Sequence, residues 1–398
     1  MKIDLKILCF VILFTVAAAL LFFFSGIPGT GGPAAVHDEV WENLKFVKNV
    51  MIWFMLMLVA FLMIFVKKYE WGVALAVLLA AAGSFVVYLF IHDVYFKDAW
   101  NQDLMLGAVI CSITLVIAIG CFLGTVKMWQ YLLIGILFAP SYVLIEWFIG
   151  NVTLFGAFAQ DPGGSILVHM CAAYFGLGVA VALREKRTFK EPMYTTTHSI
   201  SFVWLAAMLL WVLWPAFVTA LLPMDLVTIG MITCYLAGIG SVISAWIVCY
   251  KIQKKVDPLV YTYAMLAGPV AIGAPLLMVG PWAALAVGIV AGIVSALSFI
   301  YLQPRLCDWL GARDVMGVHN LHGVAGWVGV AASSLVMLLY GAVNWALANI
   351  AVGLIVFVAA LSLGIVSGIV LKMTRGCMCD DELFSDDADF IKNEEPMI

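Results

Sequence analysis

The run WGVALAVLLAAAGSFVVYLFIH (71–92) contains no Asp, Glu, Lys or Arg. A helix of this length crosses the hydrocarbon core of a bilayer, which is about 30 Å thick. Similar apolar runs fill most of the chain, and they lack the alternation of membrane β-strands. The sequence therefore predicts an all-α polytopic membrane protein. About twelve transmembrane helices are expected, near residues 5–25, 49–66, 71–92, 103–124, 128–150, 164–184, 200–222, 226–250, 258–279, 281–302, 319–340 and 345–372.

The composition of the 398-residue chain excludes several classes of protein. Hydrophobic residues make up 65% of it and charged residues only 11%, whereas soluble proteins carry roughly a quarter charged residues. The net charge of −4 and the lack of a basic domain exclude nucleic-acid binding. The nine cysteines lie mostly in apolar runs, where they act as small hydrophobic side chains. We find no nucleotide loop, nucleophile elbow or usual metal-ligand spacing, so neither an enzyme nor a cofactor is predicted.

The basic residues indicate the orientation in the membrane. With the N-terminus inside and the sides alternating, seventeen of the 20 Lys and Arg fall in inner segments. The three outer ones are Lys45, Lys48 and Lys97. Because cytoplasmic loops carry an excess of Lys and Arg, we predict a multi-pass protein of the cell membrane with both termini in the cytoplasm.

The first apolar run, near residues 5–25, can be read as a signal peptide or as a retained span. Its continuation through FFF (22–24) lacks a small-residue cleavage site, which favours a retained span. We expect one transmembrane channel domain over residues 1–376, because no linker indicates a second soluble domain.

The last residues, 377–398, are rich in Asp and Glu and are expected to form a solvated, acidic cytoplasmic tail. Cys377 and Cys379 begin this tail as a Cys-x-Cys pair. The pair is interpreted as incidental, with metal binding or lipidation as the alternatives.

Three of the six histidines lie in predicted spans. His169 lies about five residues into the sixth span, and His319 and His322 open the eleventh. An ionisable side chain inside the membrane is costly and by default faces the protein interior or a water-filled path. A single such residue can also be a satisfied structural histidine, but two spans with histidines favour a functional role. The remaining histidines are expected to be solvated or interfacial: His37, His92 and His198.

The two histidine-bearing spans have similar surroundings. An aspartate precedes His169 and His319, and a glycine follows each of them seven residues later. Spans two to six (about 49–184) and seven to eleven (about 200–340) form two blocks of five. Because five is odd, the second block inserts upside down, which is the inverted-repeat plan of transporters. We therefore expect two inverted five-helix repeats around a central pore, with an extra N-terminal and a C-terminal helix.

The two aspartates of these neighbourhoods are Asp161 and Asp314. We expect both to cap helix N-termini, where unpaired N–H groups and the helix dipole favour a negative charge. A buried carboxylate at either place would also shape the electrostatic field along a path through the protein.

Two short motifs resemble a known family. GGSILVH (163–169) and GVHNLHG (317–323) are similar to the Rh branch of the ammonium transporter/Rh glycoprotein family, and the likeness extends over about 49–372. Glu146 also lies where Rh proteins carry a glutamate. The extra N-terminal span fits the twelve-span Rh layout. Three further segments resemble the corresponding Rh stretches: WPAF (214–217), LAGPVAIGA (266–274) and GIVSALSFIYLQPRL (292–306).

The resemblance implies a homotrimer whose subunits each hold a narrow hydrophobic pore for ammonia. His169 and His319 would be the paired histidines that line the pore. Asp161 would be the structural aspartate at its outer end, and Phe217 one of two stacked phenylalanines that close the outer entrance. Two more residues of the Rh motif are expected beside the pair: His322 and Asn320.

Three positions depart from the Rh pattern. In a gapless match the second gate phenylalanine falls on Ile110, which can exclude water but cannot stack. The asparagine that usually follows the gate phenylalanine is Val218, and a polar position before LAG (266–268) is Tyr263 instead of asparagine. These changes leave gating, substrate range and conduction itself open.

An apolar pore selects against charge. A bare ion entering it loses hydration at an ideal cost on the order of 20 kcal/mol, which remains several kcal/mol after relaxation. Neutral ammonia loses only a few hydrogen bonds. Two neutral imidazoles can share a proton and offer partners to a passing amine. We therefore predict that ammonium is deprotonated near the outer gate and that ammonia, with methylammonium as a further substrate, uses the pore.

Other functions remain open at this stage. The pore can instead conduct carbon dioxide or another small neutral molecule, since its entrance is less aromatic and less polar than in Rh proteins. A non-conducting Rh-like sensor or structural membrane protein is a third reading, against which the intact histidines argue. A transporter of larger solutes would need a roomy polar site at the midplane, and the sequence offers no charged residues for one.

Overall fold

The computed structural model describes residues 36–66, 68–190, 195–376, 378–379 and 382–391. The predicted first span, 5–25, lies outside these residues. The chain divides into two compact units, Met1–Glu42 and Asn43–Ile398. Only a few residues of the first unit are described.

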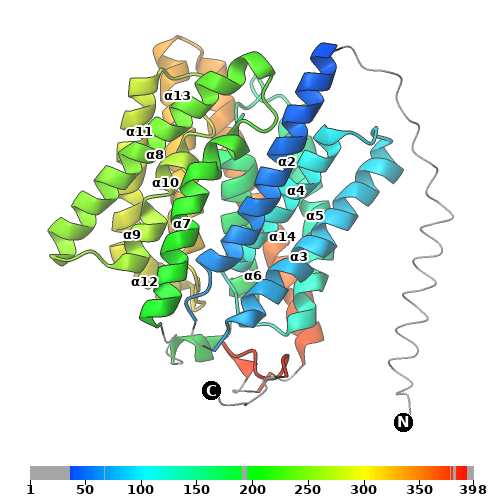
Figure 1. Ribbon diagram of the computed structural model, residues 1–398, viewed down its shortest axis with the longest axis vertical. Helices are drawn as coiled ribbons and strands as arrows, with labels where there is room; N and C mark the ends of the chain where they lie inside the picture. Colours follow the sequence, from blue (N-terminus) through cyan, green and yellow to red (C-terminus); the bar gives the residue numbers. More distant parts are fainter. Residues whose placement is uncertain (1–35, 67, 191–194, 377, 380–381, 392–398) are drawn as a thin grey trace. The chain divides into compact units, whose positions relative to one another are not determined.

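Helices account for the regular structure of the described residues, apart from one isolated β-bridge between Leu154 and Ala157 (Figure 1). Several of them contain π-helical segments, in which backbone bonds run from residue i to residue i+5. In chain order the elements are α2 (Val36–Leu62), α3 (Trp71–Phe90), η1 (Ile91–Phe96), α4 (Gln102–Ile119), α5 (Met128–Asn151), η2 (Ser165–Met170), α6 (Cys171–Leu183), η3 (Lys186–Phe189), α7 (Thr197–Val218), α8 (Met224–Gln253), α9 (Pro258–Ala264), α10 (Ala267–Ala271), α11 (Pro281–Leu297), η4 (Ser298–Leu302), α12 (Gln303–Leu310), η5 (His319–Gly323), α13 (Val324–Leu339) and α14 (Val343–Arg375).

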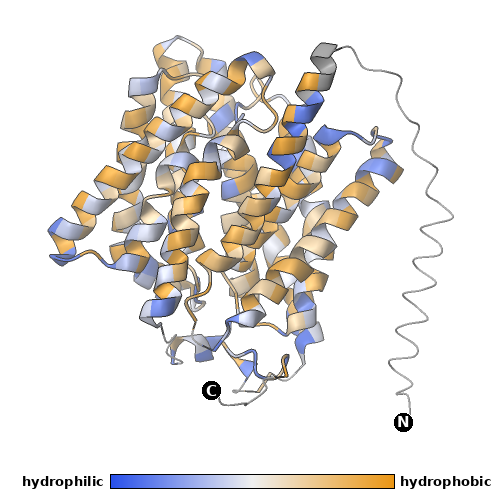
Figure 2. Ribbon diagram, viewed as in Figure 1, coloured by the Kyte–Doolittle hydropathy of each residue, from blue (hydrophilic) through white to orange (hydrophobic). Residues whose placement is uncertain are grey.

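Ten helices of the described chain are long and apolar enough to cross a membrane. Figure 2 shows hydrophobic residues along the bodies of the helices and hydrophilic ones mainly near their ends. Large apolar side chains also point outward, as Leu205, Met208 and Val212 do from α7. An outward apolar face of this kind suits contact with lipid. The chain is therefore an all-helical, multi-span membrane protein, as the composition predicts.

The prediction of one continuous span over 258–279 is wrong. The segment forms two short helices, α9 and α10, followed by turns. A side chain at Gly268 would meet the Ala237 carbonyl oxygen at 2.1 Å, and the Gly163 N–H donates to the Gly273 carbonyl at 2.8 Å. Discontinuous helices are typical of transporter sites because they bring backbone close to the pathway. Hydropathy does not detect such a break, since both halves are equally apolar.

Helix pairs recur in the two predicted blocks of five. In the first block α3 packs against α5 and α4 against α6, and in the second α8 packs against α11 and α10 against α13. The two histidine-bearing segments, η2 and η5, pack against each other. The interior of the unit is therefore formed where the two blocks meet.

The prediction of a solvated C-terminal tail also needs correction, because residues 382–391 are partly packed against the rest of the protein. Leu383 and Phe384 are buried, and the Phe384 N–H donates to the Gly124 carbonyl at 3.0 Å. The Asp386 carboxylate accepts a bond from the Gly72 N–H at 2.8 Å. Figure 1 shows this segment near the label C, at the end of the bundle where α3 begins. Its acidic composition suggested solvation, but two hydrophobic side chains and backbone hydrogen bonds attach it to the loops.

Glu185 joins the same end of the bundle to the start of this segment. Its carboxylate accepts bonds from Arg187 Nε and Nη2 at 2.8 and 2.9 Å, and it pairs with Arg375 at 3.3 Å. Arg187 Nη1 in turn donates to the Met378 carbonyl at 2.9 Å. The hydrogen bonds from Arg187 lower the pKa of Glu185 to about 2.

We expect Glu185→Gln to loosen the C-terminal segment. The pKa of Glu185 is lower in the folded protein than in the unfolded chain, so its contribution to stability is complete at neutral pH and is lost as pH falls toward 2. At pH 7, hydrogen exchange of amides 382–391 should become about five-fold faster in the variant, while parent and variant should converge near pH 2. Asp225→Asn, which changes an exposed carboxylate on α8, is the control and should exchange like the parent. Equal exchange in Glu185→Gln and the parent at pH 7 would contradict the attachment.

Candidate functional site: a histidine-lined cavity

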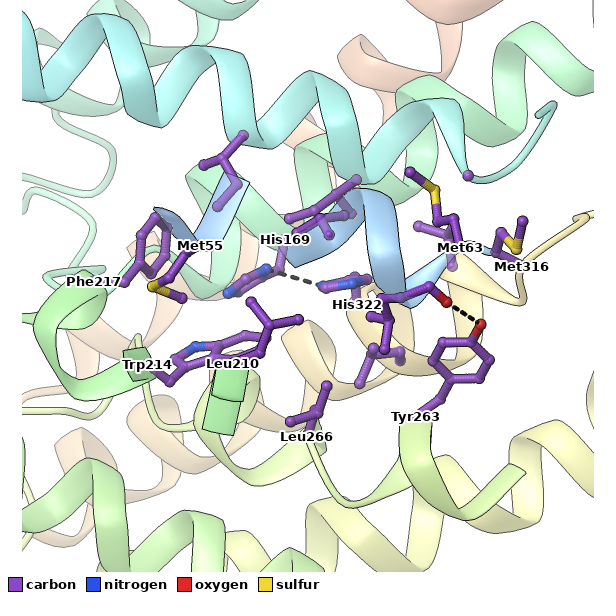
Figure 3. Close-up of a pocket in the computed structure, with 17 residues that line it drawn as sticks. Met55, Met63, His169, Leu210, Trp214, Phe217, Tyr263, Leu266, Met316 and His322 are labelled. Atoms are coloured by element: carbon purple, nitrogen blue, oxygen red, sulfur yellow. Dashed lines mark hydrogen bonds between the residues drawn. The ribbon is translucent and has the colours of Figure 1, made fainter. Parts of the chain in front are cut away.

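A narrow cavity of about 50 Å³ lies inside the second unit, between the two blocks of helices. Phe217 lies at one end and Tyr263 and Met316 at the other, with His169 and His322 between them (Figure 3). Leucine, isoleucine, valine, methionine and tryptophan side chains form nearly all of the remaining wall. The cavity is therefore largely apolar, with two imidazoles near its centre.

The two imidazoles are in direct contact. The Nδ1 atoms of His169 and His322 are 3.0 Å apart, and the ring centroids are 5.0 Å apart with an interplanar angle of 26°. Both residues are buried, with 1% and 7% of their surface exposed. Only one proton fits between two nitrogens at this distance, so one Nδ1 donates and the other accepts. The pair therefore shares a single proton, and its position sets the tautomer of both rings.

The prediction that His169 and His319 form the pair is wrong, because His322 occupies the place expected of His319. His319 is absent from the cavity lining and packs edge-on against Tyr174 at 5.8 Å. In an α-helix, residues three apart share one face. The motif is instead a π-helical turn, η5, whose wider winding directs the two histidines to different sides.

A sequence signal distinguishes the two candidates. Asp161 precedes His169 by eight residues, and Asp314 precedes His322 by the same interval, whereas His319 follows its aspartate by five. A glycine also follows both His169 and His322 seven residues later. His319 is also followed by a glycine seven residues later, so the glycine does not distinguish it from His322. Only the spacing of eight residues from the preceding aspartate identifies the histidine that lines the cavity.

The two aspartates hold equivalent places. Each carboxylate accepts two bonds from backbone N–H groups at the start of the following π-helical segment, as predicted for capping residues. Burial raises the pKa of both carboxyls, to about 7 for Asp161 and about 6 for Asp314, while these N–H donors favour the ionised form. The donors are Ile166 and Leu167 for Asp161, at 2.9 and 2.8 Å, and Val318 and His319 for Asp314, at 3.0 and 2.9 Å.

Asn320, expected beside the histidine pair, instead connects η5 to the preceding helix. Its side-chain oxygen accepts a bond from the Ser298 hydroxyl at 2.6 Å, and its amide donates to Gln303 at 2.9 Å. Ser298 begins the π-helical segment η4. Asn320 therefore supports the backbone that carries His322 and does not itself line the cavity.

A second cavity, of about 80 Å³, lies at the Phe217 end. Phe217 lines both cavities, so its ring stands between them. Ile110 also lines the second cavity. Glu146 and Asp161 also line it, which makes this space more acidic than the first. Of the two residues predicted at the gate, Phe217 therefore borders both spaces and Ile110 only the second.

His92, expected to be solvated or interfacial, takes part in a polar cluster at the edge of this second cavity. Its Nδ1 lies 2.7 Å from the Asp98 carboxylate and its Nε2 lies 3.7 Å from that of Glu146. The Tyr88 hydroxyl donates to Glu146 at 3.1 Å, and the Tyr88 ring stacks on His92. The cluster therefore places a histidine ring and a second carboxylate beside Glu146, which lines the second cavity.

Two polar atoms in the first cavity lack a hydrogen-bond partner among the described residues. They are Nε2 of His169 and Nε1 of Trp214. The two rings are close, with centroids 5.7 Å apart. Buried polar atoms without partners are costly, so this part of the cavity is suited to a small molecule that forms hydrogen bonds.

The comparisons with known proteins match this architecture. The sequence model of the Ammonium Transporter Family covers residues 12–385. The chain belongs to the ammonium transporter family. It is similar to the Rh type A ammonium transporter of Canis lupus familiaris, with 33% identity over 300 residues that cover 71% of this chain and 69% of that protein. Similarity to the Rh type C ammonium transporter of Bos taurus is 30% over 370 residues, covering 82% and 78%.

Solved structures place this member of the ammonium transporter family beside the Rh proteins. The Nitrosomonas europaea Rh50 structure superposes with a TM-score of 0.83 and 30% identity, covering 90% of this chain and 94% of that one. A sensor Amt protein shares the fold with a TM-score of 0.74 and 17% identity. The Rh-like branch predicted from the histidine motifs is therefore confirmed.

We expect Asp161→Ala to destabilise this family member by about 1–2 kcal/mol, because the variant leaves two backbone N–H groups at the start of η2 without their acceptor. Asp161→Asn retains an acceptor oxygen and should cost less. Thermal unfolding in detergent should show a midpoint several degrees lower for the alanine variant. Asp308→Ala, at an exposed position on α12, is the control. An unfolding midpoint for Asp161→Ala equal to that of this control would rule out the capping role.

Proposed function

We propose that this protein conducts ammonia through the histidine-lined cavity, after ammonium has been recruited and deprotonated at the Phe217 end. One observation carries the proposal: two buried imidazoles share a hydrogen bond inside a passage whose other walls are almost entirely apolar. An ion entering such a passage loses its hydration at a cost of several kcal/mol, whereas ammonia loses only a few hydrogen bonds. The passage therefore favours the neutral molecule over potassium, sodium and ammonium.

In the proposed orientation the Phe217 end faces the outside of the cell membrane, and the C-terminal segment lies in the cytoplasm with the N-terminus. Seventeen of the 20 Lys and Arg then fall on the cytoplasmic side, as the positive-inside rule requires. The assembly proposed is a homotrimer with one pore in each subunit. The Rh resemblance implies this assembly, and exposed apolar side chains on α7, such as Leu205, suit contact with lipid or with another subunit.

The second cavity is suited to recruitment of the cation. Glu146 and Asp161 line it, and carboxylates at the mouth of a cleft raise the local concentration of cations. The rings and aliphatic side chains beyond Phe217 provide no comparable charge. Ammonium that reaches Phe217 releases its proton to water or to a carboxylate of this cavity, and the neutral ammonia passes on.

The unpartnered atoms of the first cavity match ammonia. Ammonia has one lone pair and three N–H bonds, so it can accept a bond from Trp214 Nε1 and donate one to His169 Nε2. This arrangement requires that His169 donate through Nδ1 to His322, which leaves its Nε2 as an acceptor. The shared proton of the histidine pair therefore sets the polarity of the ammonia position.

Flux measurements in proteoliposomes test the histidine pair. His169→Ala and His322→Ala each leave the partner imidazole buried without its hydrogen bond, and we expect about ten-fold lower ammonia permeability. His319→Ala is the matched control, three residues away in the same motif, and should conduct like the parent. Equal permeability in the parent and in both cavity variants would remove the histidines from the conduction mechanism. A defect in His319→Ala as large as that in His322→Ala would show that the cavity geometry does not select the functional residue.

Carbon dioxide is the second candidate substrate. It has no hydrogen to donate, so it matches the other tautomer, in which His169 Nε2 and Trp214 Nε1 are both donors. Ile110 also makes the entrance less aromatic. Stopped-flow permeability of the same proteoliposomes to ammonia, methylammonium and carbon dioxide separates the candidates. If only the permeability to carbon dioxide is higher than in protein-free liposomes, carbon dioxide and not ammonia is the substrate.

A further inference from the structure

Tyr263 lies at the end of the histidine-lined cavity opposite Phe217 (Figure 3). It is buried, and its hydroxyl donates to the Leu62 carbonyl at 3.0 Å. Its ring stacks on Phe299 with centroids 5.8 Å apart and an interplanar angle of 18°. The phenol is therefore held at its hydroxyl and across one face, while another part of the side chain lines the cavity.

One restraint on Tyr263 comes from the wall of the cavity, which Leu62 lines, and the other comes from Phe299, behind that wall. Leu62 is the last residue of α2, so its carbonyl is one of those that a helix C-terminus leaves without an internal partner. Phe299 belongs to the π-helical segment η4, which Ser298 and Asn320 connect to the segment carrying His322. The ring thus links the end of α2 to the half of the protein that holds the second histidine.

The neighbours of Tyr263 at this end are flexible. Met63 and Met316 line the same part of the cavity, and methionine side chains adapt readily to the space around them. Tyr263 has a rigid planar ring and the one hydroxyl group among the side chains that line the cavity. Of the three residues, it sets the shape of this end.

We propose that Tyr263 is the gate and size filter at the end of the pore opposite Phe217, and that its ring must swing away from the Leu62 carbonyl before a molecule can pass. The inference rests on the proposed conduction of ammonia. It adds a residue that selects by size to the histidine pair, which selects by charge. Ammonia requires a small displacement of the ring, whereas methylamine, with an additional methyl group, requires a larger one within packed surroundings.

Tyr263→Phe tests the restraint without opening a cavity, since the ring and its stacking partner remain. The lost hydrogen bond should ease the swing of the ring and raise ammonia permeability about five-fold, which corresponds to one net hydrogen bond. Tyr263→Asn removes the ring and should raise the ratio of methylamine to ammonia permeability at least five-fold. The full-length protein in proteoliposomes is used for both measurements, and thermal unfolding verifies that each variant is folded.

Tyr261→Phe is the matched control. Tyr261 lies on the same helix, α9, and its hydroxyl also donates to a backbone carbonyl, that of Val242, at 3.3 Å. It is absent from the cavity lining. This variant should retain the parent permeability for ammonia and for methylamine, because the loss of a hydroxyl away from the pore does not alter the gate.

The outcomes separate this inference from the proposed function. A parent protein without ammonia permeability would overturn both. A conducting parent whose permeability and methylamine ratio match those of Tyr263→Phe and Tyr263→Asn would overturn the gate alone. Lower ammonia permeability in both variants would also overturn it, because Tyr263 would then assist passage. Equal increases in Tyr261→Phe and Tyr263→Phe would assign the effect to loosening of α9.

Discussion

The hydrogen bond between Nδ1 of His169 and Nδ1 of His322 is the interaction on which the rest of the site depends. It joins segments 153 residues apart in the chain, and it requires two π-helical turns, η2 and η5, to pack against each other. An aspartate precedes each turn and accepts two hydrogen bonds from backbone N–H groups at its start. The close approach of Gly163 and Gly273 brings the interrupted helix α9–α10 against the same place. These contacts together hold the two buried imidazoles within hydrogen-bond distance of each other.

The position of charge along the passage follows from the cost of burying it. Carboxylates lie in the second cavity and at the ends of the π-helical segments, where water or backbone N–H groups stabilise them. The first cavity holds imidazoles, an indole and a phenol, which are neutral when buried in an apolar environment. In the proposed function, an acidic entrance followed by an apolar interior concentrates a cation at the entrance and passes only its neutral form. Phe217 separates these two environments because it lines both cavities.

The composition of a segment does not always predict how that segment folds and packs. The segment 258–279 is as hydrophobic as a continuous span, yet it is divided between α9 and α10, and Gly268 in α10 packs directly on the Ala237 carbonyl. The acidic C-terminal segment has the composition of a solvated tail, yet Leu383 and Phe384 are buried against the loops. In both cases the decisive partners are distant in the chain. Hydropathy measures the preference of a segment for lipid or water and contains no information about such partners.

The sequence by itself determined the membrane class, most of the spans, the Rh-like family and the two segments that carry the paired histidines. These features are local, because the cost of an ionisable group in lipid and the length needed to cross a bilayer apply residue by residue. The capping aspartates were also predictable, since a cap acts on the turn that follows it. The tertiary structure showed that His322, and not His319, faces His169, because a π-helical turn and an α-helical turn place the same motif on different faces. The spacing of eight residues from the preceding aspartate is the sequence feature that agrees with this choice. The tertiary structure likewise decided the contacts of Tyr263, whose partners, Leu62 and Phe299, come from other helical segments.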